Sequence, residues 1–182
     1  MFIQFLGATQ TVTGSKYLIK AGNKTVLVDC GLFQGAKHLR LKNWELLPIQ
    51  ANKIDAVILT HAHIDHSGYI PLLVKQGFKG RIYCTEATFD LCSILLPDSG
   101  HLHEEEARYA NKKGYSKHNP ALPLYTREDA EKSLDHFSPQ PFEQDIDLGP
   151  DFNCTFFMQA TYWVHLLFEC NILTPRFYFL VI

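Results

Sequence analysis

The chain of 182 residues is long enough for one domain with a buried core, and its 46% hydrophobic and 20% charged residues are ordinary for a soluble globular protein. A formal net charge of −2 leaves no overall basic surface, so nucleic-acid binding cannot be argued from charge. The five cysteines include no Cys-x-x-Cys pair, which favours reduced, buried thiols and a cytoplasmic location. The N-terminus has neither the basic start nor the long apolar run of a signal peptide, and we interpret it as a first strand.

Short apolar runs rich in β-branched residues predict five strands. They cover residues 2–6, 17–20, 24–31, 54–63 and 80–85. The runs at 24–31 and 54–63 each hold a continuous apolar stretch and then end in polar residues or glycine, and such stretches are typical of strands buried on both faces. Between the first two strands, the segment GATQTVTGS is predicted to turn at Gly7 and Gly14, because glycine tolerates positive φ.

Apolar residues spaced by three and four, together with capping signals, predict four helices. They cover residues 69–76, 86–97, 102–114 and 126–136. Pro71 stands near the start of the first, where proline is tolerated. Thr126 and Asp129 have the spacing of a capping box at the start of the last. Strands mixed with helices at this density predict an α/β sandwich, with no internal repeat and no linker.

The stretch LTHAHIDHSG, residues 59–68, places four candidate metal ligands directly after an apolar strand. They are His61, His63, Asp65 and His66. Imidazole and carboxylate are the usual nitrogen and oxygen ligands of zinc. In extended backbone His61 and His63 would point the same way, because side chains alternate with period two. Asp65 and His66 could then face a second ion, and two ions about 3.5–4 Å apart can stabilise the attacking and leaving oxygens of a hydrolysis.

This stretch resembles the metal-binding signature of the metallo-β-lactamase superfamily. Together with GATQTVTGSKYLI, LVDCGLFQG and the run from ILTHAHIDHSG to EAT, it is similar to the β-CASP branch, whose members are mostly RNA-processing nucleases. The resemblance runs from residue 2 to about residue 160. It implies an αββα sandwich, of which this chain would hold the N-terminal half, two zinc ions and hydrolysis of RNA phosphodiesters.

The resemblance also implies a role for each of five residues. His61 and His63 would bind the first zinc ion, and Asp65 and His66 the second. Asp65 would in addition be the catalytic residue that takes a proton from the attacking water. Asp29 would accept a hydrogen bond from a ligand histidine and fix its orientation. The alternative for Asp29 is an ordinary turn residue at the end of a strand.

The remaining polar residues have simpler interpretations. Thr60 and Gly68 are interpreted as structural, and the turn at 7–15 either lines the active site, as the resemblance implies, or is a plain connection. Three glutamates are expected in a solvated first helical turn, four histidines on the surface, and three lysines at a solvated helix end. These ten residues are Glu104, Glu105, Glu106, His101, His103, His118, His136, Lys112, Lys113 and Lys117.

After about residue 160 the sequence departs from the β-CASP pattern. The family's next ligand histidine, in a Gly-His-x-x-Gly-Ser stretch, is expected where Thr161 and Tyr162 stand. His165 is too far along a strand to replace it, since three or four residues span roughly 10–13 Å. No aspartate follows Asp151 to bridge two ions, and the β-CASP domain and the second half of the catalytic domain are not found.

We therefore divide the chain into residues 1–160, the N-terminal part of a metallo-β-lactamase domain, and an atypical apolar tail at 161–182. The tail carries Glu169 and Arg176 as its only formal charges, and it is too interrupted for a membrane span. We interpret it as out-of-frame translation from a disrupted gene. The alternative is a divergent C-terminus that pairs with another subunit through its apolar surface.

Three functions remain open. The first is a zinc-dependent ribonuclease of the β-CASP type, truncated and impaired in this chain. The second is another metallohydrolase of this fold, acting on thioesters or lactams, which the His-x-His-x-Asp-His signature alone does not exclude. The third is a non-catalytic remnant or interaction module, because half a sandwich leaves a strand edge unpaired and would favour self-association. The expected partner is RNA, and no membrane association is expected.

Overall fold

The structure, a computed structural model, describes residues 2–116, 118–149, 152–158, 166–171 and 176–180. One group of strands comprises β1 (Phe2–Phe5), β2 (Tyr17–Ala21), β3 (Lys24–Val28), β4 (Ala56–Ile58), β5 (Arg81–Thr85) and β6 (Phe137–Gln140). The other comprises β7 (Asp145–Asp147), β8 (Asn153–Met158), β9 (Leu166–Asn171) and β10 (Arg176–Leu180). The α-helices are α1 (Lys37–Leu41), α2 (Ile64–Ser67), α3 (Ile70–Lys75), α4 (Glu86–Lys113) and α5 (Arg127–Leu134), with 3-10 turns η1 (Lys42–Trp44) and η2 (Ala51–Lys53).

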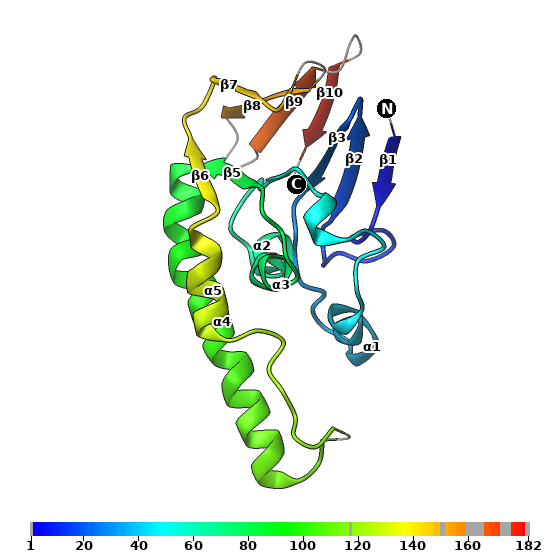
Figure 1. The fold of residues 1–182 in the computed structure, drawn as a ribbon, viewed down its shortest axis with the longest axis vertical. Coiled ribbons are helices and arrows are strands. Elements are labelled where there is room, and N and C mark those ends of the chain that lie inside the picture. The colour runs from blue at the N-terminus through cyan, green and yellow to red at the C-terminus, as the bar shows by residue number, and fades with distance from the viewer. Residues whose placement is uncertain (1, 117, 150–151, 159–165, 172–175, 181–182) are drawn as a thin grey trace.

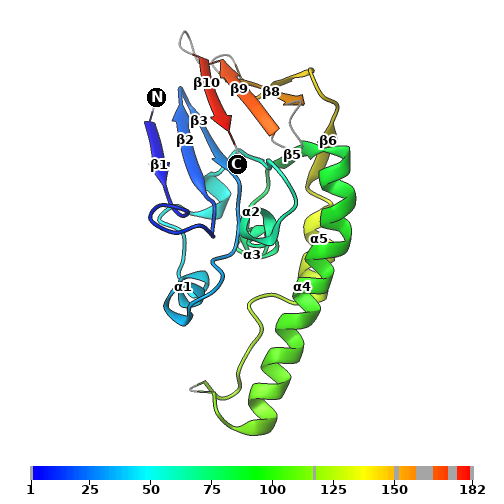
Figure 2. The same ribbon diagram turned by 180° about the vertical axis from the view of Figure 1, so that it is seen from behind.

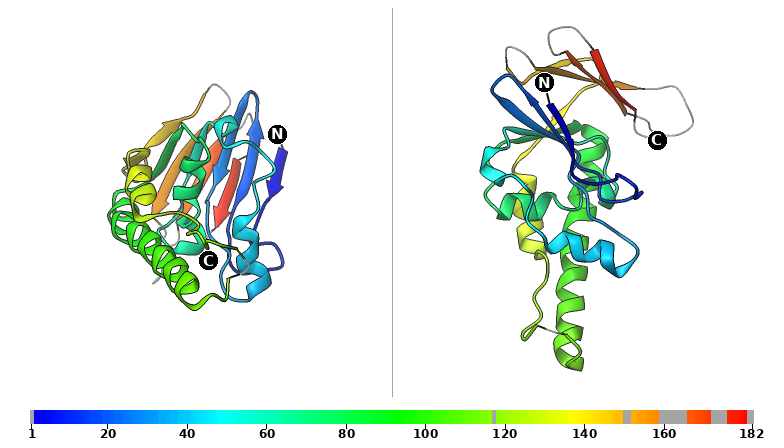
Figure 3. Two further views of the ribbon diagram at one scale, coloured as in Figure 1. Left: turned by 60° about the horizontal axis from the view of Figure 1, so that its bottom comes forward. Right: turned by 90° about the vertical axis from the view of Figure 1, so that its right-hand side faces the viewer.

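The strands form two sheets that lie face to face, with helices on the free face of the first sheet (Figures 1 and 3). The first sheet has the order β1-β2-β3-β4-β5-β6. It is antiparallel from β1 to β3 and parallel from β3 to β6. The second sheet, β10-β9-β8-β7, is antiparallel throughout. The described residues therefore form helix, sheet and sheet layers, as expected for the N-terminal half of an αββα sandwich.

The first sheet separates two hydrophobic cores. On β3, Leu27 packs into the core beneath the helices, whereas Val26 and Val28 pack into the core between the sheets. Val57 and Ile58 of β4 divide in the same way. The continuous apolar runs at these strands are thus explained by burial on both faces, as predicted.

Both of these strands end earlier than predicted. β3 stops at Val28 because Asp29 has a φ of +56°, which turns the chain out of the extended conformation. β4 stops at Ile58, and residues 59–63 form an irregular segment that leads into α2. In the first turn, Gly14 has the predicted positive φ of +83°. Gly7 also lies in the turn, as predicted, but its φ is not positive; glycine is needed there because a Cβ would lie 1.8 Å from the carbonyl oxygen of Gly14.

The two helices predicted at 86–97 and 102–114 are one helix, α4, which extends well past the rest of the domain (Figures 1 and 2). The Thr85 side chain caps its start and Gly114, with a φ of +66°, ends it. Pro97 lies inside this helix. Gly100 is not a helix breaker but a contact point: a Cβ there would lie 2.7 Å from the Thr126 carbonyl oxygen, just before α5.

The other helix signals agree with the structure. Thr126 and Asp129 form the predicted capping box of α5, and Pro71 lies in the first turn of α3. Four cysteines are buried free thiols, as predicted, while the cytoplasmic location stays a prediction; they are Cys30, Cys84, Cys92 and Cys154. In the part of the chain that the structure describes, no helix is both long and apolar enough to cross a membrane.

Candidate metal centre

The four candidate ligands gather where the chain leaves β4 and enters α2. His63 is the N-cap residue of α2, and Asp65 and His66 lie within its single turn. The backbone N–H of Leu59 donates to Tyr83 of β5 at 2.8 Å, which fixes the start of the segment. The ligands thus lie beyond the carboxyl ends of two parallel strands, where backbone held by the sheet meets the surface.

His61 and His63 face each other. The Nε2 atom of His61 lies 3.1 Å from Nδ1 of His63, and the two ring centroids are 4.7 Å apart. Two imidazole nitrogens bound to one tetrahedral zinc ion, each at about 2.0–2.1 Å, would lie about 3.3 Å apart. The pair therefore has a separation that suits one ion. Strand alternation is not what aligns the two rings, because residues 59–63 are not part of β4.

Asp65 and His66 form a second pair beside the first. The Nε2 atom of His66 lies 3.7 Å from Oδ2 of Asp65. The His66 ring centroid is 4.0 Å from that of His61, so the two pairs adjoin. Their assignment as ligands of a first and a second ion stays a prediction.

Asp29 lies at the base of both pairs and is buried. Its Oδ2 accepts hydrogen bonds from Nδ1 of His66 at 2.7 Å and from the Ser15 hydroxyl at 3.2 Å. Its Oδ1 accepts from the backbone N–H and the hydroxyl of Thr60, at 2.9 and 2.8 Å. Four donors thus occupy the roughly four lone-pair sites of one carboxylate. The contact with His66 is the one that the role predicted for Asp29 requires.

Burial and neighbouring charges shift the pKa values of His61 and His66 in opposite directions. Burial lowers the pKa of His61 to about 4, and the neighbouring His66 adds to the effect, so the His61 ring is neutral at neutral pH. At His66 burial opposes protonation, but the hydrogen bond and charge of Asp29, together with the charge of Asp65, outweigh it and raise the pKa. Because a metal ligand must be an unprotonated nitrogen, a proton and a metal ion would compete for His66.

The described residues supply part of a zinc ligand set. Among them, no group of three or more histidine, cysteine, aspartate or glutamate side chains is arranged to hold a metal ion. Zinc takes four ligands, or three and a water molecule. Each of the two pairs therefore fits zinc as a fraction of a complete site. The family's next ligand histidine was expected at Thr161 and Tyr162, and these residues and His165 lie outside the described residues.

Several residues outside the motif differ from expectation. Glu104, Glu105 and Glu106 lie in the middle of α4, so their assignment to a first helical turn is wrong. Surface positions are also wrong for two histidines, both half-buried. The His103 ring packs edge-on against Tyr125, with centroids 4.9 Å apart. The Nδ1 atom of His136 lies 3.0 Å from the carbonyl oxygen of Gly80.

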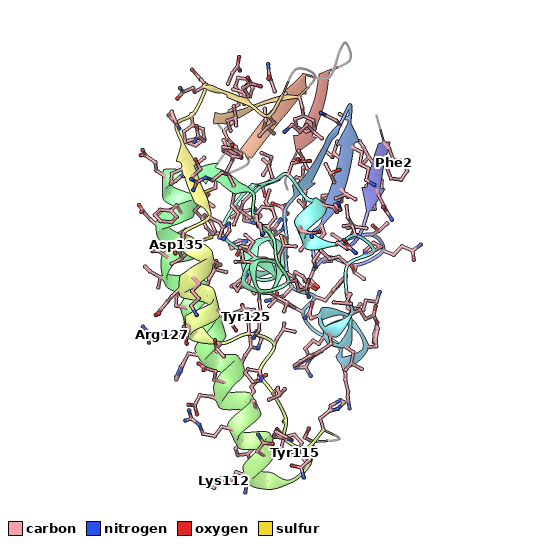
Figure 4. All side chains as sticks on the ribbon, viewed as in Figure 1. Phe2, Lys112, Tyr115, Tyr125, Arg127 and Asp135 are labelled. Carbon is pink, nitrogen blue, oxygen red and sulfur yellow. The ribbon has the colours of Figure 1, made fainter. Side chains whose placement is uncertain are left out.

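The other surface predictions hold where the structure tests them. His101 and His118 are exposed. Lys112 and Lys113 are exposed in the last turn of α4, and Lys112 lies at the end of that helix farthest from the sheets (Figure 4). Lys117 lies outside the described residues.

Sequence reasoning missed three polar residues that support the site. Thr60 and Ser15 bond to Asp29, and the Ser15 backbone N–H also donates to the Asp65 carbonyl at 2.8 Å, so the turn at 7–15 reaches the site through its last residue. The buried Lys16 ammonium donates to the carbonyl oxygen of Gly31, two residues beyond Asp29. Lysine is rarely buried, so nothing in the sequence marked it as interior.

Comparisons with known proteins agree with the fold and the motif. The pattern of the Metallo-beta-lactamase superfamily matches residues 11–152. Ribonuclease TTHA0252 of Thermus thermophilus is 36% identical over 143 residues, which are 79% of this chain and 29% of that protein. Transcription termination factor FttA of Methanosarcina mazei is 36% identical over 154 residues, which are 83% of this chain and 22% of that protein. This chain thus spans less than a third of these relatives' length.

A further relative and two solved structures complete the comparison. The Integrator complex subunit 11 homolog of Dictyostelium discoideum is 37% identical over 102 residues, 51% of this chain and 13% of that protein. The metallo-β-lactamase fold protein YhfI of Bacillus subtilis superposes with a TM-score of 0.51 at 20% identity, over 92% of this chain and 56% of that chain. A metallo-β-lactamase of Cronobacter sakazakii gives 0.54 at 16% identity, over 93% and 55%. The predicted fold is confirmed, and the chain belongs to the metallo-β-lactamase superfamily, in which it groups with the β-CASP branch that its sequence resembles.

Proposed function

We propose that this chain carries the first metal-ligand motif of a zinc-dependent hydrolase that cleaves RNA phosphodiesters. The observation that supports it is the convergence of His61, His63, Asp65 and His66 into two adjoining pairs above one saturated carboxylate. Relatives named as a ribonuclease and as transcription termination factors favour RNA over other substrates. The ligand set, imidazole with carboxylate, suits zinc better than magnesium or calcium.

Each residue has a part in such a reaction. His61 and His63 would hold one ion, and Asp65 and His66 the other. When bound, two zinc ions supply an activated water and stabilise negative charge on the attacking and leaving oxygens. The Asp65 carboxylate, whose side chain is about one-fifth exposed, is accessible to accept a proton from the attacking water. Asp29 holds the Nδ1 side of the His66 ring.

Zinc binding and RNA cleavage by the purified chain test the proposal. His63→Ala removes one member of the first pair and is expected to weaken zinc binding and abolish cleavage of a labelled RNA. His101→Ala, at an exposed position on α4, is the matched control and should change neither. Zinc affinity that is the same in His63→Ala and in the unmodified chain would contradict the ligand assignment. Turnover of a thioester or lactam but not RNA would indicate the other class of hydrolase.

A second function is a non-catalytic remnant or interaction module. It is favoured by one observation: among the described residues, no group of three or more histidine, cysteine, aspartate or glutamate side chains is arranged to hold a metal ion. Such a chain would bind zinc weakly, would not cleave RNA, and would associate with itself or with a partner. Light scattering at several concentrations separates the cases, because a monomer at every concentration counts against self-association.

We also propose that residues 161–182 are out-of-frame, and that the superfamily domain ends near residue 160. The tail combines low charge with the loss of the family motif, and the superfamily match itself ends at residue 152. Reading all three frames of the gene downstream of codon 150 tests this. A Gly-His-x-x-Gly-Ser stretch in another frame is the expected result. Its absence from every frame would mean that the tail is genuine.

A further inference from the structure

The hydroxyl of Thr60 lies between the buried carboxylate and the first candidate ligand. Its Oγ1 atom donates to Oδ1 of Asp29 at 2.8 Å and lies 3.0 Å from Nδ1 of His61. Thr60 is fully buried, so water does not compete for either contact. The backbone N–H of Thr60 donates to the same Oδ1 atom at 2.9 Å, so two hydrogen bonds hold the residue against Asp29.

Counting protons fixes the state of the His61 ring. A threonine hydroxyl has one proton and two lone pairs. Because the proton of Thr60 is given to Asp29, its oxygen can only accept at the other contact, and Nδ1 of His61 must carry the hydrogen. A neutral imidazole has one N–H. The Nε2 atom of His61 is therefore a bare lone pair, and it is the atom that faces His63 at 3.1 Å.

We infer that Thr60 is a positioning residue that fixes the Nδ1–H tautomer of His61, so that the Nε2 lone pair is presented to a metal. This inference rests on the proposed metal site and deepens it. Asp29 does the same for the neutral ring of His66 directly, since its carboxylate oxygen accepts from Nδ1 at 2.7 Å and leaves Nε2 without a hydrogen. One buried carboxylate thus sets the tautomers of two candidate ligands, the first through a hydroxyl and the second by contact.

Replacement of Asp29 by asparagine tests whether the direct contact with Asp29 sets the tautomer of His66. The backbone N–H of Thr60 can only donate, so the amide oxygen of asparagine must stay on that side. The amide NH₂ group then faces His66, where it also can only donate. Nδ1 of a neutral His66 must become an acceptor, and its hydrogen moves to Nε2, the nitrogen that would bind metal. Asp29→Asn is therefore expected to reverse the His66 tautomer.

The effect of the Thr60 hydroxyl on the tautomer of His61 is tested with Thr60→Val, Thr60→Ser and Ser67→Ala. Valine keeps the shape of threonine but lacks the hydroxyl, whereas serine restores it. Ser67 is a matched control, because its buried hydroxyl donates to the carbonyl oxygens of Ala62 and His63 rather than to a ring. Long-range ¹H–¹⁵N correlation spectra of the chain without metal report which ring nitrogen is protonated, and zinc titration reports affinity.

The expected result is an Nδ1–H tautomer of His61 in the unmodified chain, in Thr60→Ser and in Ser67→Ala, and a shift toward Nε2–H in Thr60→Val. Zinc affinity should fall about 10–100-fold in Thr60→Val and recover in Thr60→Ser. An unchanged tautomer in folded Thr60→Val would overturn the inference, as would an Nε2–H tautomer in the unmodified chain. If the tautomer shifts but no variant binds zinc, the positioning role stands and the proposed metal site fails.

Discussion

The buried lysine beneath the candidate site predicts an unusual dependence of stability on pH. The Lys16 ammonium donates to the Gly31 carbonyl and lies 4.8 and 4.7 Å from the ring centroids of Phe33 and Tyr69. Burial lowers its pKa to about 8, and the nearby Cys30 only partly opposes this shift. At neutral pH the fold therefore holds a buried cation that has no carboxylate among these contacts.

The sign and size of the effect follow from the two pKa values. The unfolded chain holds the Lys16 proton up to the ordinary value of 10.5, while the folded chain releases it at about 8. Between these values the unfolded state binds more protons, so the free energy of unfolding rises with pH. At 1.36 kcal/mol for each pKa unit, the rise reaches about 3 kcal/mol. Below pH 8 the penalty of burying the charge is fully present.

Urea unfolding of the unmodified chain and of Lys16→Met, followed by circular dichroism, measures this contribution. Methionine keeps an apolar stem against the two rings without the charge. Cysteines and tyrosines titrate in both proteins, so their contributions cancel in the difference between the two unfolding free energies. This difference should change by up to about 3 kcal/mol in favour of the unmodified chain between pH 8 and 10.5. Lys20→Met, on the exposed side of β2, is the matched control.

A flat difference for Lys16→Met would refute the reasoning, because it would mean that the lysine keeps its ordinary pKa. A change in favour of the variant as pH rises would do so as well, since it would require a pKa raised by folding.

Three further predictions concern stability and are read by urea unfolding. Gly31→Ala would place a Cβ 1.6 Å from the Asp65 carbonyl oxygen and should cost more than about 4 kcal/mol, whereas Gly35→Ala, with open space around it, should cost only the roughly 1–2 kcal/mol of a left-handed residue. Equal losses would contradict the contact. Thr126→Ala should cost about 1 kcal/mol by removing the α5 capping box, with an unchanged midpoint arguing against the cap. Leu73→Ala, in the core beneath the helices, should cost about 2–5 kcal/mol, and a loss below this range would mean that the core refills the cavity.

The part of the fold that could be predicted from the sequence is the part where local pattern and tertiary contacts agree. The runs at β3 and β4 are apolar on both faces because a core lies on each side of them. β6 was missed because Pro139 argues against a strand. Proline is tolerated at the edge of a sheet, and β6 is an edge strand, which only the assembled sheet reveals.

The continuity of α4 was missed for a similar reason. In the sequence, Pro97 and Gly100 indicate the end of one helix and a gap before the next. In the fold Gly100 is where the chain entering α5 crosses the helix, and the close approach of Thr126 explains its lack of a side chain. A single sequence does not distinguish a glycine needed for a close contact from a glycine that ends a helix.

In the candidate site, the ligands could be predicted because they are neighbours in sequence, whereas the hydrogen bonds to Asp29 that support them join residues that are neighbours only in space. His61, His63, Asp65 and His66 lie within six positions, so their clustering could be read directly. Their support could not, because the bonds to Asp29 come from residues 14, 31 and 37 positions away in the chain. Thr60 in particular was interpreted as structural, and its part in the site depends on the direction of one hydroxyl proton.

The backbone of Asp29 shows why its two interpretations, strand-end turn residue and support for a ligand, are compatible. A φ of +56° costs a non-glycine residue roughly 1–2 kcal/mol. Hydrogen bonds to charged groups contribute about 1.5–3 kcal/mol each. The four donors around its carboxylate outweigh the strain, and the residue's own N–H is satisfied by the Ile58 carbonyl at 2.9 Å. The turn takes Asp29 out of the line of β3, and its carboxylate reaches both Thr60 and His66. The left-handed turn and the orientation of the histidines therefore belong to one arrangement, in which the site's hydrogen bonds stabilise the backbone that positions it.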